Sequence, residues 1–238
     1  MWYNKRMCGR YSLIASPNEL KERFRVKKID GKLVPRFNAA PAQQLPLISN
    51  TSPTRMQLGE WGLVPAWMRD EKSVKRLINA RAETIGEKPT FKSAAEKRRC
   101  LIIADGFYEW GVDPKAKRKQ PYRILLKDET PFAMAGIYNE VKNKKTGIAH
   151  LEFAIITTEA NTLVAKIHNR MPAILKKKDE ERWLDESIPL EDAIAVLKPH
   201  PANKMKAYPV SYAVNNPDNE SPDVITPLDQ LPTQKPLI

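Results

Sequence analysis

The chain has 238 residues, of which 42% are hydrophobic and 29% are charged, so it can bury one large core or two small ones; we expect a single domain. No apolar run is long enough to cross a bilayer, and the charged residues that follow Trp2 and Tyr3 do not fit a signal peptide. The composition excludes an integral membrane protein and predicts a soluble, cytoplasmic one. Cys8 and Cys100 lie far apart, which excludes a disulfide framework and a CxxC metal site.

The formal net charge is +12. A surface with this excess attracts polyanions, and nucleic acid is the simplest abundant polyanion of a cytoplasm. Basic residues cluster at several places, for example at 97–99 and 115–119, although a single cluster of this kind is more often a solvated loop than a binding site. The charge therefore favours a nucleic-acid partner without establishing one.

The first predicted element is a short helix after Ser16. The run Ser16-Pro17-Asn18-Glu19 places an N-cap serine, a first-turn proline and an N3 glutamate in the order that opens helices. A strand is predicted at 45–48. The Ser-Ala-Ala-Glu run at 93–96 repeats the capping-box spacing just before an apolar strand at 100–103. Further strands are predicted at 122–126, 132–138 and 153–158.

A helix should follow from Asn161 to about Ile167, because Asn is a good cap and Pro172 limits the length of the helix. Two more helices are predicted at about 178–184 and 190–197, and the proline-dotted end of the chain should wrap the surface in extended form. Strands outnumber helices and do not alternate with them regularly. The sequence therefore predicts an α+β domain with a mostly antiparallel sheet.

Cys8 follows an internal methionine, Met7, that could itself be a translation start. A cysteine at a free N-terminus is a 1,2-aminothiol, in which the amine condenses with an aldehyde and the thiol closes on the imine to give a thiazolidine ring. At reference pKa values the α-amine is mostly protonated at neutral pH, so a nearby acid–base group would help. In the alternative interpretation, Cys8 is only a small buried residue.

Two further residues suit proton transfer. Glu109 stands among three aromatic residues after an apolar strand, and burial there would raise its pKa toward neutrality. His168 stands near the predicted end of a helix, and histidine is the usual proton shuttle. The alternatives are an exposed strand carboxylate and a structural histidine.

Polar and small apolar residues alternate from Asn79 to Thr84, so in an extended strand Asn79, Arg81 and Glu83 share one face. That face could line a site in which the amide orients an amine or a thiol and the guanidinium grips a phosphate. An edge strand that faces water fits the pattern equally.

Two segments, at 35–41 and 60–67, combine aromatic residues, prolines and a basic or acidic residue. A surface that stacks on bases or wedges them apart has this kind of composition. Core packing explains Trp61 equally well, whereas Trp67 leads into a charged segment and is expected to be exposed.

Together these segments resemble the SRAP family, the SOS-response-associated peptidase-like or abasic-site-processing proteins. The motifs that carry the resemblance occur in family order from residue 7 to about residue 216: Met-Cys-Gly-Arg, Arg-x-Asn-x-Ala-Pro, Trp-Gly-Leu-x-Pro-x-Trp, Asn-Ala-Arg-Ala-Glu-Thr, Arg-Arg-Cys-Leu with Asp-Gly-Phe-Tyr-Glu-Trp, and His-x-Arg-Met-Pro. The resemblance implies a compact α+β domain with a curved, barrel-like sheet and short peripheral helices. We expect an N-terminal extension at 1–6, an SRAP domain at 7–228 and a tail at 229–238.

The resemblance also implies that Cys8 forms a thiazolidine crosslink with the ring-opened aldehyde of an abasic site in single-stranded DNA. In that case Asn79 helps to hold the cysteine, Glu109 transfers protons, and His168 assists sugar ring opening and elimination, which would give a lyase side activity. The residues implied to contact DNA are Arg10, Asn38, Pro41, Trp67, Arg81 and Arg170. We expect no metal, no cofactor, and a monomer that works in the cytoplasm at the nucleoid.

The segment Met1–Arg6 departs from the family pattern, because with it attached Cys8 has no α-amine. Either translation begins at Met7 and an aminopeptidase exposes the cysteine, or the protein acts as a peptidase and removes residues 1–7 itself. We favour the first route, because aminopeptidases readily remove methionine before small residues.

Two other interpretations fit parts of the sequence. A cysteine peptidase would use Cys8 as the nucleophile and His168 as the base, with Asn79 or Glu109 orienting the imidazole, and it would work with an internal cysteine. A plain single-strand-binding module would use the basic and aromatic surface alone, and Cys8 would be inert. The co-occurrence of a methionine-flanked cysteine with the full motif set favours abasic-site chemistry over both.

Overall fold

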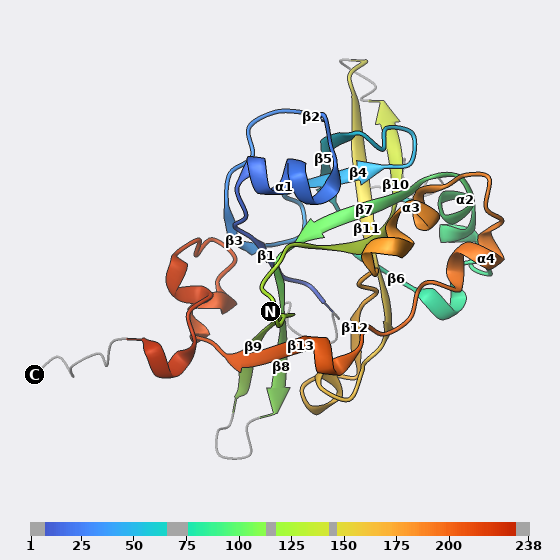
Figure 1. Cartoon of the computed structure of the whole chain (residues 1–238). Helices are drawn as coiled ribbons and strands as arrows, with labels where there is room; N and C mark the ends of the chain where they lie inside the picture. Colours follow the sequence, from blue (N-terminus) through green and yellow to red (C-terminus); the bar gives the residue numbers. More distant parts are fainter. Residues whose placement is uncertain (1–7, 66–75, 113–117, 143–146, 232–238) are drawn as a thin grey trace, which may run out of the picture.

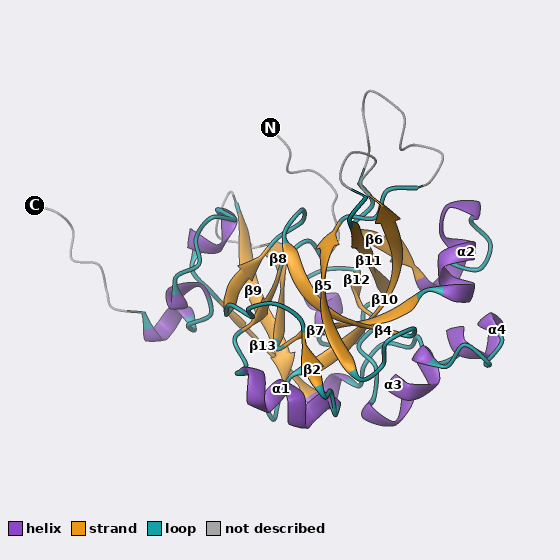
Figure 2. Ribbon diagram, turned by 90° about the horizontal axis from the view of Figure 1, so that it is seen from above, coloured by secondary structure: helices purple, strands orange, loops and turns teal. Residues whose placement is uncertain are grey.

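The computed structural model describes residues 8–65, 76–112, 118–142 and 147–231. Their strands form two sheets, with short helices around the outside (Figures 1 and 2). The first sheet contains, in spatial order, β13 (Met205–Pro209), β9 (Lys119–Leu126), β8 (Gly106–Val112), β1 (Tyr11–Leu13) and β3 (Arg36–Ala39). All of its pairings are antiparallel.

The second sheet closes on itself. In spatial order it contains β12 (Arg170–Pro172), β11 (Ala149–Glu159), β10 (Phe132–Lys142), β7 (Arg99–Ala104), β4 (Gln44–Ser49), β5 (Arg55–Trp61) and β2 (Lys28–Ile29), and β6 (Asn79–Arg81) pairs with β11. Because β5 also pairs with β11, in parallel, the strands β11, β10, β7, β4 and β5 form a closed barrel. The predicted α+β domain with a curved, barrel-like and mostly antiparallel sheet is confirmed.

The helices are short and peripheral (Figure 2). They are α1 (Pro17–Phe24), α2 (Pro89–Lys97), α3 (Lys177–Leu184) and α4 (Leu190–Ile194), with 3₁₀ turns at Ala82–Thr84, Val164–Lys166, Ala202–Lys204, Tyr212–Asn215, Pro222–Val224 and Leu228–Gln230. The predicted cap of α1 is confirmed, because Ser16 Oγ accepts a hydrogen bond from the Glu19 backbone N at 3.3 Å. No helix in the described part of the chain is long and apolar enough to span a membrane.

Two predicted helices are shorter in the structure, and the one expected at about 190–197 is α4, which ends at Ile194. The helix expected at 161–167 is a single 3₁₀ turn, although Asn161 caps it as predicted: its Oδ1 accepts from the backbone N of Leu163 at 3.0 Å and of Val164 at 2.9 Å. The turn ends early because the chain must enter strand β12 at Arg170. The run at 93–96 does not start a helix; it lies inside α2, which begins at the first-turn proline, Pro89.

The apolar core lies on both faces of the barrel strands. Alternate residues of β7 divide between two clusters, one that also contains helix residues and one that contains Trp61. Trp61 is completely buried, stacks on Phe153 with ring centroids 6.3 Å apart, and contacts the Tyr11 ring at 5.2 Å. Core packing is therefore the right interpretation of Trp61, and Tyr11 anchors strand β1 to the barrel.

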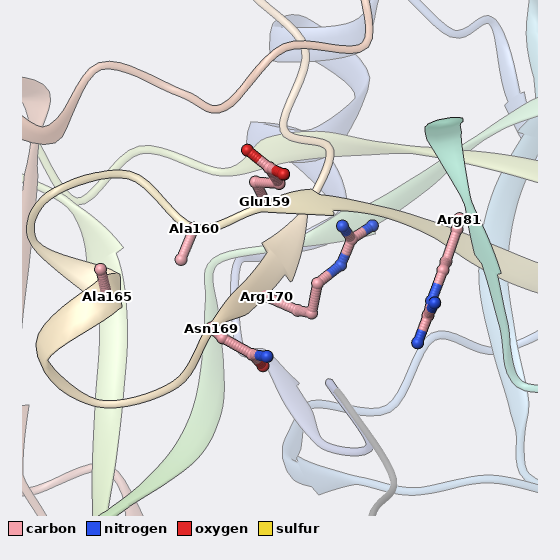
Figure 3. Close-up of a pocket in the computed structure, with 6 residues that line it drawn as sticks. All are labelled: Arg81, Glu159, Ala160, Ala165, Asn169 and Arg170. Carbon is pink, nitrogen blue, oxygen red and sulfur yellow. The ribbon is translucent and has the colours of Figure 1, made fainter. Parts of the chain in front are cut away.

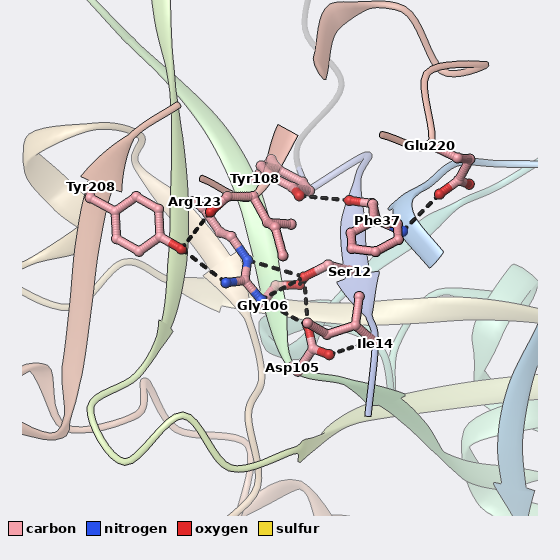
Figure 4. A network of polar contacts seen from close by, with 10 residues as sticks. Ser12, Ile14, Phe37, Asp105, Gly106, Tyr108, Arg123, Tyr208 and Glu220 are labelled. Carbon is pink, nitrogen blue, oxygen red and sulfur yellow. Dashed lines mark hydrogen bonds and ion pairs between the residues drawn. The ribbon is translucent and has the colours of Figure 1, made fainter. Parts of the chain in front are cut away.

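A buried polar network holds strand β1 from its other side (Figure 4). Asp105 accepts hydrogen bonds from Ser12 Oγ at 2.6 Å, from Arg123 Nη2 at 3.0 Å and from the Ile14 backbone N at 2.5 Å. Arg123 also donates to the Tyr208 hydroxyl at 2.9 Å, so the network joins β1 to β9 and β13. Because the Asp105 carboxylate and the Arg123 guanidinium are both buried, each needs the opposite charge of the other to offset its loss of hydration.

Replacing Asp105 with alanine should lower the free energy of unfolding by about 3–5 kcal/mol, because the Arg123 guanidinium would remain buried without its carboxylate. Urea denaturation followed by circular dichroism measures the change. Glu181→Ala is the matched control, since the Arg25–Glu181 pair is 87% and 89% exposed and should contribute nothing measurable. Equal effects of the two substitutions would contradict the prediction.

Candidate active site

Cys8 and Glu109 are in contact just before the start of strand β1. The Cys8 backbone N donates a hydrogen bond to Glu109 Oε1 at 2.5 Å, and both side chains are buried, with 2% of each residue exposed. The contact arises because β1 pairs with β8, and the Tyr108 backbone N donates to the Arg10 carbonyl at 3.0 Å beyond the last strand pair. The predicted carboxylate therefore lies against the nitrogen of the predicted nucleophile.

The burial of Glu109 changes its acidity. Burial raises the pKa of the Glu109 carboxyl above its ordinary value, while the nearby His168 and the contacts with Cys8 pull the pKa in the opposite direction. A carboxyl group held in this way can exchange protons nearer to neutral pH than an exposed glutamate. The exposed-carboxylate interpretation is excluded, and the predicted burial of Glu109 is confirmed.

The His168 side chain lies close to the Glu109 carboxylate. Its Nδ1 lies 4.0 Å from Glu109 Oε2 and 3.1 Å from the backbone N of Arg170, which donates a hydrogen bond to it. The same Nδ1 lies 3.3 Å from the Arg170 carbonyl, to which it would donate in the other tautomer. The side chain is 23% exposed, so the histidine connects the buried carboxylate with solvent.

The Cys8 thiol is not a ready nucleophile. Burial raises the pKa of the thiol well above its ordinary value, and the negative charge of Glu109 adds to the rise. The positive charge of Arg170 lowers the pKa of the thiol by a smaller amount. The Glu109 carboxyl group therefore contacts both the backbone nitrogen and the thiol of Cys8.

Arg170 is tied to an acidic partner. Its Nη1 and Nη2 donate to the two carboxylate oxygens of Glu83 at 2.6 and 2.9 Å, and Nη2 also donates to the Thr157 carbonyl at 2.6 Å. The hydrogen bond from Arg170 is the main cause that lowers the pKa of Glu83. Glu83 lies in the 3₁₀ turn after β6, so it reaches Arg170 and does not continue the strand face of Asn79 and Arg81.

An open pocket of about 490 Å³ lies beside Arg170 (Figure 3). Its lining residues are Arg81, Glu159, Ala160, Ala165, Asn169 and Arg170. Arg81 comes from β6 and is exposed, whereas Arg170 comes from β12 and is 8% exposed. The two strands flank β11, which brings the two guanidinium groups to one pocket.

Asn79 also lies in this neighbourhood. It is the first residue of β6, half-buried, and pairs with Ile155 of β11. A Cβ atom built on Gly9 would lie 3.9 Å from Ile78 Cδ1, so the start of β6 runs beside the chain that follows Cys8. The segments that carry Cys8 and Asn79 are therefore close together in the fold.

Three of the residues predicted to contact DNA do not line this pocket. Asn38 is completely buried and donates to three backbone carbonyls in residues 214–219, so it cannot reach DNA, and that prediction is wrong. Arg10 is 7% exposed, and its Nη1 donates to Asn38 Oδ1 at 2.9 Å and to the Val214 carbonyl at 2.8 Å, which makes it internal as well. Pro41 is half-buried in the turn after β3, and Trp67 lies outside the described residues.

Two features of this region had no signal in the sequence. Glu159 and Asn169 line the pocket although neither belongs to a strand face that the alternation of residues predicted. The bidentate pair of Arg170 and Glu83 joins residues 87 positions apart, which no local spacing indicates. Within the described residues, no group of three or more His, Cys, Asp or Glu side chains is arranged to hold a metal ion.

Comparison with known proteins gives the family. The family model described as SOS response associated peptidase (SRAP) matches residues 7–217. The chain belongs to the SRAP family. SRAP relatives include the abasic site processing protein YoqW of Bacillus subtilis, 42% identical over 224 residues that cover 92% of this chain and 99% of YoqW. The abasic site processing protein HMCES of Rattus norvegicus is 30% identical over 86% of this chain and 68% of HMCES.

Two solved structures have the same fold as this chain. A crystal structure of a protein from Bacteroides thetaiotaomicron matches with a TM-score of 0.80 and 32% identity, covering 92% of this chain and 99% of that one. A crystal structure of a protein from Bordetella bronchiseptica matches with a TM-score of 0.73 and 25% identity, covering 86% and 100% of the two chains. The chain is therefore related by sequence to proteins named for abasic site processing, and by fold to these two solved structures.

Proposed function

We propose that this protein captures abasic sites in single-stranded DNA by forming a covalent thiazolidine through an N-terminal Cys8. The observation that carries the proposal is the 2.5 Å contact between the Cys8 nitrogen and Glu109 Oε1. In a chain that begins at Cys8 this nitrogen is the α-amine, and the carboxylate is in position to take a proton from it.

The chemistry proceeds in two stages. The neutral amine adds to the C1 aldehyde of the ring-opened deoxyribose, and loss of one water from the carbinolamine gives an imine. Glu109 accepts the proton of the α-ammonium and returns a proton to the departing hydroxyl. The Cys8 thiol then adds across the imine: a carbon–sulfur bond forms, the thiol proton passes to the nitrogen, and the ring closes without an oxidant or a reductant.

His168 completes the proton path in this proposal. Its ring lies 4.0 Å from the Glu109 carboxylate and is partly exposed, so it can relay protons between the site and solvent. The same group could assist opening of the sugar ring before capture. Strand cleavage by elimination would use the imine stage, and it would compete with ring closure by the thiol.

DNA binding is assigned to the pocket beside Arg170 and to the overall charge of +12. Arg81 is the better phosphate ligand, because it is exposed, whereas Arg170 is engaged by Glu83. Replacing Arg81 with alanine should weaken binding of single-stranded DNA and reduce the salt-dependence slope by roughly one unit. Fluorescence anisotropy over a range of salt concentrations measures both; an unchanged slope would remove Arg81 from the interface.

A cysteine peptidase is the second candidate, and the site is less suited to it. That mechanism needs a thiolate, and burial and Glu109 hold the pKa of the Cys8 thiol well above its ordinary value. Self-removal of residues 1–7 would still be compatible with abasic-site capture, because it would expose the same α-amine. General peptidase activity would be indifferent to the state of the N-terminus.

The test uses protein produced from Met7, with the mature terminus verified by mass, and a single-stranded oligonucleotide that carries one abasic site. A shifted band should survive denaturant and high salt, and mass spectrometry should show the sum of the two masses minus one water. An oligonucleotide with a tetrahydrofuran residue, which has no aldehyde, is the matched control. A complex that dissolves in denaturant would leave only non-covalent binding, and turnover of peptides by a chain with residues 1–7 still attached would favour the peptidase.

A further inference from the structure

The C-terminal segment that follows β13 contacts Arg10, two residues after Cys8, and Trp110, the residue after Glu109. A 3₁₀ turn at Tyr212–Asn215 brings this segment, drawn in red in Figure 1, back beside β3 and the residues that precede β1. Two of its carbonyls accept hydrogen bonds from Arg10, which precedes β1, and one of its side chains accepts from Trp110 of β8.

On the cysteine side, the contact is made through Arg10, two residues after Cys8. The Arg10 guanidinium donates from Nη1 to the Val214 carbonyl at 2.8 Å and from Nη2 to the Asn215 carbonyl at 3.3 Å. Because Arg10 is 7% exposed, these bonds are shielded from water and fix the start of β1.

On the carboxylate side, the contact is made through Trp110, the residue after Glu109. The Trp110 indole Nε1 donates to Asn215 Oδ1 at 2.7 Å. Successive side chains of a strand point to opposite faces, so a tryptophan held on one face fixes the backbone that directs Glu109 to the other. Asn215 therefore binds the neighbours of both groups, one with its carbonyl and one with its side chain.

The turn itself is anchored from β3. Asn38 Nδ2 donates to the carbonyls of Val214 at 3.2 Å, Asn216 at 2.8 Å and Asn219 at 3.1 Å, and its Oδ1 accepts from Arg10. Glu220 Oε2 accepts from the backbone N of Phe37 at 2.7 Å, as Figure 4 shows. A completely buried amide with every donor satisfied holds the turn in one position.

We propose that Asn215 is a positioning residue, which keeps the Cys8 nitrogen and the Glu109 carboxylate in contact by holding Arg10 and Trp110 at once. The inference rests on the proposed function, because it concerns the rate of that reaction. Asn215 does not touch the reacting atoms. Its loss should slow capture without weakening the binding of DNA.

The test compares Asn215→Ala, which removes the acceptor, with Asn215→Asp, which keeps an oxygen for the indole. Adduct formation is timed at saturating DNA, and affinity is measured separately with the tetrahydrofuran oligonucleotide. Asn215→Ala should lower the first-order rate about two- to tenfold, the range for one lost hydrogen bond, with an unchanged Kd. Asn215→Asp should restore most of the rate, and thermal melting reports any general loss of stability.

A second variant, Trp110→Phe, removes the same hydrogen bond between the Trp110 indole and Asn215 Oδ1. It removes the indole donor and keeps an aromatic ring, so it should slow capture as Asn215→Ala does, and the double variant should be no slower than either single one. Additive losses, or a rate in Asn215→Ala equal to that of the unaltered chain, would overturn the positioning role. Failure of the unaltered chain to form any adduct would instead overturn the proposed function.

Discussion

Replacing Cys8 with serine in the mature chain should abolish the stable adduct while leaving an imine that borohydride can trap. The serine keeps the α-amine beside Glu109, so condensation with the aldehyde proceeds. A hydroxyl is a much weaker nucleophile than a thiol and forms a readily reversed oxygen ring. After denaturation the adduct should fall to background without borohydride and reappear when borohydride is present during the reaction.

Alanine at the same position is the matched control, since Cys8→Ala also retains the amine and should behave as the serine variant does. A chain with residues 1–7 still attached should give no trapped product, because its nitrogen at position 8 is an amide. A stable adduct with Cys8→Ser would show that sulfur is not the closing group, and no trapped imine would show that the amine is not the first nucleophile.

Replacing Glu109 with glutamine should lower the rate of adduct formation by about 10²–10⁴, the usual contribution of a positioned acid–base group. The amide keeps the shape of the carboxylate and a hydrogen-bond acceptor for the Cys8 nitrogen, but it cannot carry a proton. Single-turnover kinetics at saturating DNA measure the rate. A change of less than about threefold would contradict the proton-transfer role, because such a role accounts for at least 10².

The pH dependence of the same reaction tests the acidity of Glu109. The carboxylate must be ionised to accept a proton from the ammonium, and burial raises the pKa of Glu109 above its ordinary value. On acidification the rate should therefore begin to fall above the range of an exposed glutamate, which titrates at about 4.3. Glu109→Gln should lose this limb and keep only the titration of the amine. An unaltered chain whose rate fell only at about 4.3 would contradict the shift.

Several elements with local signals were predicted correctly from the sequence. The apolar run at 100–103 lies in β7, and the expected helix at 178–184 is α3 with one more residue at its start. Glu109 was placed correctly as a buried carboxylate because three aromatic neighbours surround it in the sequence. In these cases the side chains that decide the structure are close along the chain.

The errors concern residues whose environment is made by distant parts of the chain. Asn38 has the character of a surface recognition residue, but a segment about 176 positions away covers it and accepts the hydrogen bonds that its Nδ2 donates. The closure of the barrel by the parallel pairing of β5 and β11 also has no local signal. Arg170 was expected to serve a phosphate, and its partner Glu83 was expected to share a face with Asn79.

The hydrogen bonds between Arg10 and the C-terminal turn can form only late in the synthesis of the chain. The hydrogen bond between Arg10 and the Val214 carbonyl joins residues 204 positions apart, so it forms only after nearly the whole chain has left the ribosome. If Cys8 is the mature terminus, as proposed, a nascent chain carries its aminothiol before the contacts of the C-terminal turn with Arg10 can form. On that proposal, the terminus would meet free aldehydes during translation without the hydrogen bonds that the C-terminal turn supplies in the finished protein.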